Sequence, residues 1–401
     1  GREISTTQAF VRVLTALVRN KELAPRVVPI VPDEARTFGM EGMFRQIGIY
    51  APEGQKYTPV DKDQVMYYRE DAAGQILQEG INEAGAFCSW MAAATSYSSN
   101  DRIMIPFYIY YSMFGFQRAG DLWWAAGDMH ARGFLLGGTA GRTTLNGEGL
   151  QHQDGHSHVL TSVIPDCLSY DPAFAHEFAV IVHDGLRRMI QEQEDVYYYI
   201  TVMNENYAQP GLVPGDEEGI VRGGYRFRAG TKDAAQRVQL LGSGTILREV
   251  LAAAELLEND WGIAADVWSM TSFTELRRDG LDCERWNMLH PEEPPKVPYV
   301  TRMFEKTSGP LVAATDYMKA YAGQIRPFLP AGRRYHVLGT DGFGRSDFRA
   351  RLREHFEIDR RFVVVAALTA LADDGVVERR LVADAIGKYD IDPEKPNPHH
   401  A

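Results

Sequence analysis

Short apolar runs alternate regularly with segments of helical periodicity along this chain. Strands that alternate with helices form βαβ units, in which helices cover both faces of a mainly parallel sheet. The runs that predict strands are 26–31, 103–111, 134–136, 163–164, 196–202, 238–244, 266–269, 311–314 and 335–338. The sequence therefore predicts an α/β protein with a mainly parallel sheet, followed by a second α/β region.

Local signals predict individual elements. Ser5 followed by Gln8 has the spacing of a capping box at the start of a helix. Residues 72–95 are rich in Ala and Gly and carry apolar residues at helical spacing, which predicts one long helix. Pro106 lies inside the apolar run 103–111, and because proline cannot donate a hydrogen bond to a sheet, it predicts either an edge strand there or the point at which the chain leaves the sheet.

Charge and cysteine content exclude several classes of protein. The formal net charge of −12 argues against a nucleic-acid partner, because such proteins need clustered Lys and Arg. The most apolar run, 362–372, is shorter than the roughly 20 residues that span a bilayer, so no membrane partner is expected. Three cysteines without a Cys-x-x-Cys pair fit reduced thiols, which predicts a cytoplasmic protein. The chain begins at Gly1 without Met, as expected for a piece of a longer protein.

The densest group of titratable side chains lies at 152–158, where His152, His156 and His158 surround Asp154. Imidazole and carboxylate ligands suit zinc or iron, although no His-Glu-x-x-His element accompanies them. The same residues could instead form an acid–base or substrate-binding loop, or hydrogen-bonded scaffolding. The residues alone leave these three interpretations open.

Glu83 is a carboxylate with apolar or very small neighbours, because Ala, Gly and Phe residues follow it on a predicted helix. Burial there would disfavour its ionised form. A neutral Glu can donate a hydrogen bond and transfer a proton near neutral pH. The alternative is an exposed Glu on the flank of the helix.

Aromatic residues gather where the run 103–111 ends. They are Tyr108, Tyr110, Tyr111, Phe114 and Phe116. Such a cluster can stack on a heteroaromatic ring, but aromatic side chains also form cores, and the pattern permits both.

Several long motifs carry a resemblance to one family. They are DEARTFGMEG at 33–42, QEGINEAGAF at 78–87, IPFYIYYSMFGFQR at 105–118, LNGEGLQH at 145–152, TSFTEL at 271–276 and GTDGFGRSD at 339–347. In this order they closely resemble the homodimeric type of pyruvate dehydrogenase, the thiamine-diphosphate-dependent component of the pyruvate dehydrogenase complex.

The resemblance implies a domain organisation. Residues 1–212 would form the pyrimidine-binding domain of the thiamine diphosphate fold, 213–229 a linker, and 230–401 a transketolase-like C-terminal α/β domain. Members of the family bind the diphosphate and Mg²⁺ through a Gly-Asp-Gly…Asn motif in an N-terminal domain. Because this motif is absent here, the Mg²⁺ ligands are expected in a separate N-terminal half, and no metal ligands are expected in this chain.

The resemblance also implies roles for individual residues. Glu83 matches the catalytic Glu that hydrogen-bonds a ring nitrogen of the cofactor's aminopyrimidine and so controls the tautomer that takes the thiazolium proton. Phe114 matches the aromatic residue that stacks on this ring, and Tyr111 lies beside it. The other positions that match residues near the cofactor or the dimer contact are Ile81, Asp33 and Glu34.

Two further matches concern the substrate. His152 corresponds to a catalytic His that would orient pyruvate or its adducts and support proton transfer during acetyl transfer. The polar stretch 53–69 falls where the family has a mobile loop that closes over bound intermediates and excludes water.

The function implied by the resemblance is oxidative decarboxylation of pyruvate through thiamine diphosphate, with reductive acetylation of the lipoyl group of dihydrolipoyl acetyltransferase. The expected partners are a second copy in a homodimer, the lipoyl and subunit-binding domains of that acetyltransferase, and the diphosphate-binding half. Without that half, the chain alone is expected to be inactive. The alternatives are a transketolase-like or other 2-oxo-acid thiamine diphosphate enzyme, or a non-catalytic fragment.

Overall fold

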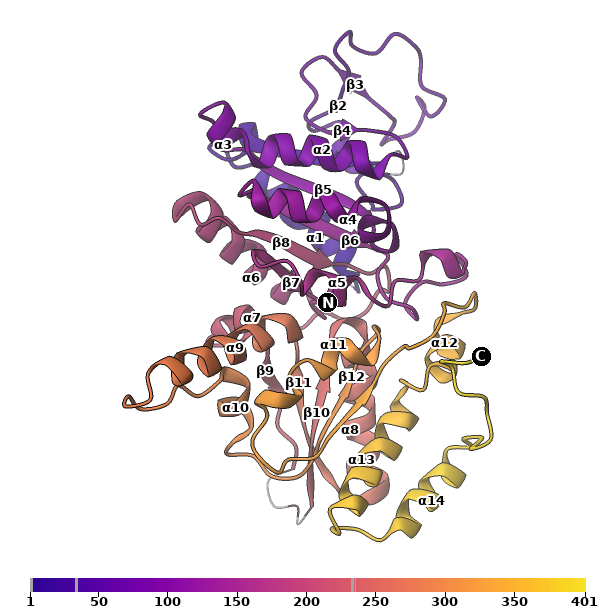
Figure 1. Ribbon diagram of the computed structural model, residues 1–401. Coiled ribbons are helices and arrows are strands. Elements are labelled where there is room, and N and C mark those ends of the chain that lie inside the picture. The colour runs from indigo at the N-terminus through magenta and orange to yellow at the C-terminus, as the bar shows by residue number, and fades with distance from the viewer. Residues whose placement is uncertain (1–2, 33–34, 232–233, 235) are drawn as a thin grey trace. The chain divides into compact units, whose positions relative to one another are not determined.

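The structure is a computed structural model that describes residues 3–32, 35–231, 234 and 236–401 (Figure 1). By internal contacts the chain divides into two compact units. The first comprises Gly1–Ala140, Leu160–Ser169 and Phe178–Pro210, and the second Gly141–Val159, Tyr170–Glu177 and Gly211–Ala401. Two short segments from the N-terminal half of the sequence thus pack with the C-terminal unit.

A six-stranded sheet in the order β4-β1-β5-β6-β8-β7 forms the centre of the first unit. Its strands are β1 (Val27–Val31), β4 (Leu77–Gln78), β5 (Ile105–Tyr111), β6 (Phe134–Gly138), β7 (Cys167–Tyr170) and β8 (Tyr197–Thr201). The pairs β1–β4, β1–β5, β5–β6 and β6–β8 are parallel. A small parallel pair, β2 (Ile49–Tyr50) and β3 (Glu70–Asp71), lies outside this sheet.

Residues 141–159 belong to the second unit. Helices precede or connect the strands along the sequence. They are α1 (Thr6–Leu17), α2 (Glu83–Ala94), α3 (Ser96–Ser99), α4 (Ser112–Asp128), α5 (Ser157–Thr161) and α6 (Ala175–Leu186), with 3₁₀ turns η1 (Ala24–Arg26), η2 (Glu41–Met43) and η3 (Leu150–His152) and a π turn η4 (Arg187–Gln191). Ser5 caps α1 by accepting a hydrogen bond from the Gln8 N–H at 3.1 Å, which confirms the predicted start of this helix.

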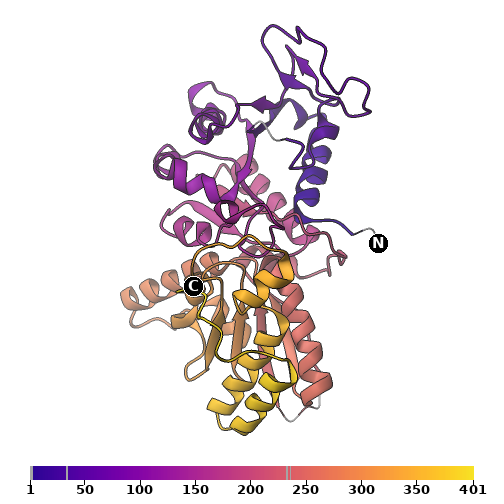
Figure 2. The ribbon, with the colours of Figure 1, turned by 90° about the vertical axis from the view of Figure 1, so that its right-hand side faces the viewer.

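Different helices cover the two faces of the six-stranded sheet. Successive side chains of β5 point to opposite faces, so neighbouring residues of this strand contact different helices. Phe107 contacts Phe10 of α1, with ring centroids 6.3 Å apart. Its neighbour Tyr108 instead contacts Phe87 of α2, at 6.4 Å. Figure 2 shows α1 on the opposite side of the strands from α2. The C-terminal end of β5 leads into α4, which packs against α2.

The single helix predicted over 72–95 is wrong in its first half. Leu77 and Gln78 form β4 instead and pair with β1 at the edge of the sheet. Gly80 then adopts φ +77°, which a helix excludes, and Asn82 caps a new helix that begins at Glu83. The apolar residues of this segment belong partly to a short strand and partly to a helix, and together they imitate the spacing of one long helix.

The edge strand predicted from Pro106 is also wrong, because β5 lies between β1 and β6 in the middle of the sheet. Pro106 is paired with Val28 close to the beginning of β5, where the strand loses only one donor. Gly133 makes room for the proline ring, since a Cβ there would lie 2.8 Å from the ring carbon Cγ. The strand predicted at 163–164 begins later, at Cys167.

The second unit contains a five-stranded sheet in the order β13-β12-β10-β11-β9, parallel except for β9. Its strands are β9 (Tyr225–Arg228), β10 (Arg237–Gly242), β11 (Ala264–Ser269), β12 (Leu311–Ala314) and β13 (Tyr335–Leu338). Its helices are α7 (Glu217–Arg222), α8 (Leu247–Trp261), α9 (Phe273–Leu289), α10 (Tyr299–Phe304), α11 (Lys319–Gly323), α12 (Arg349–His355), α13 (Arg360–Asp373) and α14 (Arg379–Lys388), with 3₁₀ turns η5 (Gly244–Ile246) and η6 (Arg326–Phe328).

The layers of this unit agree with the predicted α/β class. Helices α8 and α13 pack on each other and on the central strands, and α14 packs on α13 (Figure 1). Residues 213–229, expected to form a linker, instead supply α7 and the antiparallel edge strand β9. The mainly parallel α/β architecture predicted from the alternating pattern is confirmed. Within the described residues, no helix has both the length and the apolar character needed to cross a bilayer.

Candidate functional site

Glu83 is the first residue of α2, and the preceding residue fixes where the helix begins. The Asn82 side chain accepts a hydrogen bond from the Gly85 N–H at 3.1 Å, which satisfies one of the free donors of the first turn. A Cβ at position 85 would lie 2.6 Å from the Asn82 amide nitrogen, so glycine allows the cap to close tightly. The Glu83 side chain is 11% exposed.

The Glu83 carboxylate, for which the sequence predicts either burial among apolar residues or exposure on the helix flank, is paired with Arg118. Arg118 Nη1 lies 2.7 Å from Glu83 Oε1. The same guanidinium lies over the Phe114 ring, 4.1 Å from its centroid. Phe114 and Arg118 are four residues apart and therefore share one face of α4. The structure thus brings a carboxylate, a guanidinium and an aromatic ring together.

Sequence reasoning missed Arg118, although it closes the motif at 105–118. The available signal was its spacing of four residues from Phe114, which places both on one side of a helix. The pairing with Glu83 spans 35 residues, and spacing along one helix cannot reveal it.

The aromatic cluster divides into two groups. Tyr108 and Tyr110 are buried in the core between the sheet and the helices, and Phe116 packs on Trp123. Tyr111 is half-buried and contacts Phe114 edge to face, with centroids 6.0 Å apart. Tyr111 and Phe114, the two aromatic residues predicted to lie near the cofactor, are therefore neighbours at the C-terminal end of β5, whereas the other three belong to the core.

The remaining nominated residues near Glu83 have different outcomes. Ile81 is 68% exposed and lies two residues before the helix begins. Asp33 and Glu34 lie outside the described residues. The structure therefore places Ile81 on the same loop-to-helix junction as Glu83.

His152 ends the 3₁₀ turn η3 and is half-buried. Its backbone N–H donates to the carbonyl of Gly149, which has φ +93°. The segment Gly141–Val159 that carries His152 belongs to the second unit, whereas Glu83 belongs to the first. The two nominated catalytic residues are thus held by different sets of contacts.

Scaffolding explains two members of the group at 152–158. The Asp154 carboxylate accepts hydrogen bonds from the backbone N–H groups of His156 and Ser157, both at 2.9 Å. His158 is fully buried in a cluster of three rings, stacked on Tyr321 and edge-on to Tyr317, each with its centroid 4.7 Å from that of His158. In the part of the chain that the structure describes, no three His, Cys, Asp or Glu side chains are grouped to hold a metal ion.

Acid is expected to destabilise the protein through His158. Burial lowers the pKa of His158 from 6.5 to about 3, although Asp154 opposes this shift. Below pH 6.5 the unfolded imidazole therefore takes up a proton that the folded one does not. The free energy of unfolding should fall by roughly 1 kcal/mol for each pH unit in the window from 6.5 towards 3.

His158→Phe should remove this part of the acid sensitivity, because a phenyl ring can occupy the same stack without titrating. Urea unfolding midpoints at pH 7 and pH 5 measure the effect. We expect a smaller drop in the variant than in the wild type. An identical drop in both proteins would show that His158 does not carry the pH dependence.

The loop 53–69 is attached through Asp61 and Met66, and the residue before each of these two is exposed. Arg36 forms an ion pair with Asp61 and donates a hydrogen bond to the carbonyl oxygen of Met66 at 3.1 Å. The side chains of Val60 and Val65 are exposed. These apolar side chains of the loop are therefore not buried by any described residue of the first unit.

Two family models match the chain. Residues 1–210 match the model described as the pyruvate dehydrogenase E1 component middle domain. Residues 223–359 match the transketolase-like TK C-terminal domain.

Curated relatives match over nearly the whole chain. It is 67% identical over 397 residues to the pyruvate dehydrogenase E1 component of Pseudomonas aeruginosa, and 63% identical over 402 residues to that of Escherichia coli K12. These alignments cover 99% and 100% of this chain. The chain spans 45% of the length of each of these two relatives.

Solved structures show the same fold at low identity. Transketolase from Leishmania mexicana aligns with a TM-score of 0.68 and 16% identity, over 93% of this chain and 46% of that one. A split-gene transketolase described as an inactive β4 tetramer aligns with a TM-score of 0.60 and 18% identity, over 92% of this chain and 98% of that one. Since the first family model matches more than half of the chain, this protein belongs to the family of pyruvate dehydrogenase E1 components.

Proposed function

We propose that this chain supplies the pyrimidine-binding and C-terminal parts of a thiamine-diphosphate-dependent pyruvate dehydrogenase. The observation that carries the proposal is the junction of α2 and α4, where Glu83, Arg118 and Phe114 meet. The identity of 63–67% to pyruvate dehydrogenase E1 components supports it. The proposed partners are a second copy of the chain, a diphosphate-binding half that holds Mg²⁺, and the lipoyl and subunit-binding domains of dihydrolipoyl acetyltransferase.

The chemistry of these side chains fits an aminopyrimidine ring. Such a ring needs a hydrogen-bonding partner at a ring nitrogen and a flat apolar surface against its face. Glu83 can supply the first and Phe114 the second. Tyr111 and the exposed Ile81 would extend the apolar surface beside the ring.

Each residue would have a defined task. Thiamine diphosphate, when bound, would supply a nucleophilic carbon and an electron sink for the decarboxylation of pyruvate. Glu83 would hold or release a proton at the pyrimidine ring nitrogen, and Arg118 would keep its other carboxylate oxygen in place. His152 would orient pyruvate and move a proton during acetyl transfer. The loop 53–69 would exclude water when it closes.

Two alternatives differ from this proposal in one respect each. A transketolase-like enzyme would use the same cofactor with a sugar phosphate as substrate. The sequence identity to transketolases is only 14–18%, and such a likeness extends to the fold alone. For the isolated chain we favour inactivity, because residues that bind the diphosphate are expected on the other half.

Cofactor binding is expected to require both halves. The missing diphosphate contacts are charge-assisted, and losing two of them would weaken binding by about 3 kcal/mol, or about a hundredfold. Calorimetric titration of thiamine diphosphate with Mg²⁺ into the chain alone and into the reconstituted enzyme measures this difference. Tight Mg²⁺-dependent binding to the isolated chain would contradict the proposed division of labour.

The reconstituted enzyme should reduce and acetylate a lipoyl domain with pyruvate and should be inactive with a sugar phosphate donor. Product formation is followed by mass spectrometry of the lipoyl domain. Activity with the sugar phosphate but not with pyruvate would favour the transketolase-like alternative.

A further inference from the structure

The segment that carries His152 is held by residues far away in the sequence. Gly141–Val159 packs within the second unit. Thr143 and Thr144, near its beginning, bind Asp316, which lies two residues after the end of β12. The Asp316 carboxylate accepts hydrogen bonds from the Thr143 N–H at 2.9 Å, the Thr143 hydroxyl at 2.7 Å and the Thr144 hydroxyl at 2.6 Å. Gly141 lies so close to this carboxylate that a Cβ there would collide with it.

Asp316 is fully buried, so its carboxylate depends on these hydrogen bonds. Burial raises the pKa of Asp316, whereas the hydrogen bonds from Thr144 and Thr143 and the positive charge of Arg353 oppose the rise. A buried carboxylate without donors is strongly unfavourable. The donors that satisfy it belong to the His152 segment, and therefore the contact fixes the position of that segment.

Three residues at four-residue spacing, 345, 349 and 353, also donate hydrogen bonds to the segment. The backbone N–H of Arg345 donates to the side-chain oxygen of Gln153, the residue after His152, at 2.7 Å. Arg349 Nε donates to the Thr144 carbonyl at 2.7 Å. Arg353 Nε donates to the Thr143 hydroxyl at 3.4 Å. Residues 345–353 therefore contact the segment on both sides of His152, at Thr143 and Thr144 before it and at Gln153 after it.

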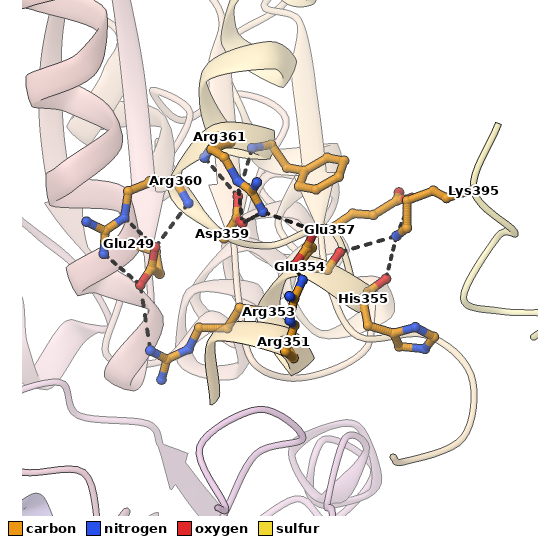
Figure 3. A network of polar contacts seen from close by, with 11 residues as sticks. Glu249, Arg351, Arg353, Glu354, His355, Glu357, Asp359, Arg360, Arg361 and Lys395 are labelled. Atoms are coloured by element: carbon orange, nitrogen blue, oxygen red, sulfur yellow. Dashed lines mark hydrogen bonds and ion pairs between the residues drawn. The ribbon is translucent and has the colours of Figure 1, made fainter. Parts of the chain in front are cut away.

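Arg353 is in turn held by a buried carboxylate (Figure 3). Its guanidinium lies 3.6 Å from Glu249 on α8. Glu249 also accepts hydrogen bonds from Arg360 Nε at 2.9 Å and Nη2 at 3.1 Å. Burial acts to raise the pKa of Glu249, but the bonds from Arg360 hold it below its usual value, so Glu249 remains charged at neutral pH.

We propose that Asp316 and Arg353 are positioning residues for His152, and that orienting this histidine is the contribution of the C-terminal unit to catalysis. This inference rests on the proposed function, because it requires that His152 act on the substrate. It assigns no contact with substrate or cofactor to Asp316 or Arg353. Both act through the 141–159 segment.

The test uses the complete, reconstituted enzyme. Asp316→Asn removes the charge, and Asn can accept fewer of the three hydrogen bonds. We expect kcat for acetyl transfer to fall at least about tenfold, as a small displacement of a proton-transfer group would cause, while the Kd for thiamine diphosphate changes less than about twofold. Thr144→Val removes one hydrogen bond without changing the shape of the side chain, and should give a smaller fall in kcat. Thr144→Val also keeps the test decisive if Asp316→Asn does not fold.

Arg353→Met and Arg353→Lys form a second pair. Lysine keeps the positive charge beside Glu249 and Thr143, so it should restore part of the turnover that methionine loses. Equal turnover in the two variants would contradict a role for the charge of Arg353 in positioning.

Asp266→Asn is the matched control. Asp266 is also buried in the second unit and accepts hydrogen bonds from Arg237 and Gln239, both at 2.8 Å, and both donors lie outside 141–159. Its replacement should lower the thermal midpoint to a similar extent and leave kcat unchanged. A similar kcat in the Asp316 and Asp266 variants would overturn the inference.

A double-mutant cycle separates positioning from general stability. If Asp316 acts through His152, then Asp316→Asn should cost no further turnover in a His152→Ala enzyme. The same loss in both backgrounds would overturn the inference and leave the proposed function standing. Absence of pyruvate turnover in the wild-type enzyme would instead refute the proposed function itself.

Discussion

Replacing Glu83 by Gln or Ala in the complete enzyme is expected to lower turnover of pyruvate by roughly 10²–10⁴-fold, the usual range for loss of a general acid–base group. Gln keeps the shape of the side chain and a hydrogen-bonding oxygen, but it cannot take up or release a proton. The loss should therefore appear in kcat rather than in the affinity for pyruvate. Steady-state kinetics with a lipoyl domain as acceptor measure it.

The structure offers a matched control for this variant. Asp195 and Arg132 form an ion pair in the same unit, with 2.6 Å between Asp195 Oδ1 and Arg132 Nη2. Asp195→Asn removes a similar carboxylate–guanidinium contact at a position that we do not connect with catalysis, and should leave turnover within about twofold. Near-normal turnover in Glu83→Gln would remove Glu83 from its proposed role.

Replacing His152 by Ala is expected to lower acetyl transfer by roughly a hundredfold while the Kd for thiamine diphosphate stays the same. The histidine is proposed to act on the substrate, so cofactor binding should not depend on it. Parallel measurement of acetyl transfer and of cofactor affinity tests this separation.

His156→Ala is the control for His152, since His156 lies on the same segment and the hydrogen bond from its backbone N–H to Asp154 is kept in the variant. We expect this variant to keep most of its turnover. Equal losses of turnover and cofactor affinity in His152→Ala would instead indicate a scaffolding histidine.

The fold could be predicted from the sequence where the apolar pattern was continuous. The runs at 26–31 and 103–111 became β1 and β5 because both are buried strands of a parallel sheet. The pattern failed at 72–82, where a two-residue edge strand and a left-handed glycine precede the helix. Such a strand is too short to show a period of its own.

The candidate site was accessible only in part. The neighbours of Glu83 in the sequence do not by themselves distinguish it from other carboxylates. Its predicted role comes from the family resemblance of the motifs at 78–87 and 105–118. The pairing with Arg118 and the support of His152 by Asp316 depend on contacts between residues 35 to 173 positions apart. Periodicity describes neighbours along one element, so contacts of this kind require the folded structure.

A crystal structure of the complete enzyme with bound thiamine diphosphate would show whether Glu83 contacts the cofactor's aminopyrimidine ring. We expect a Glu83 carboxylate oxygen about 3 Å from a nitrogen of that ring, with the Phe114 ring against the face of the pyrimidine. A Glu83 side chain turned to bulk solvent, or a cofactor bound away from the junction of α2 and α4, would contradict this expectation.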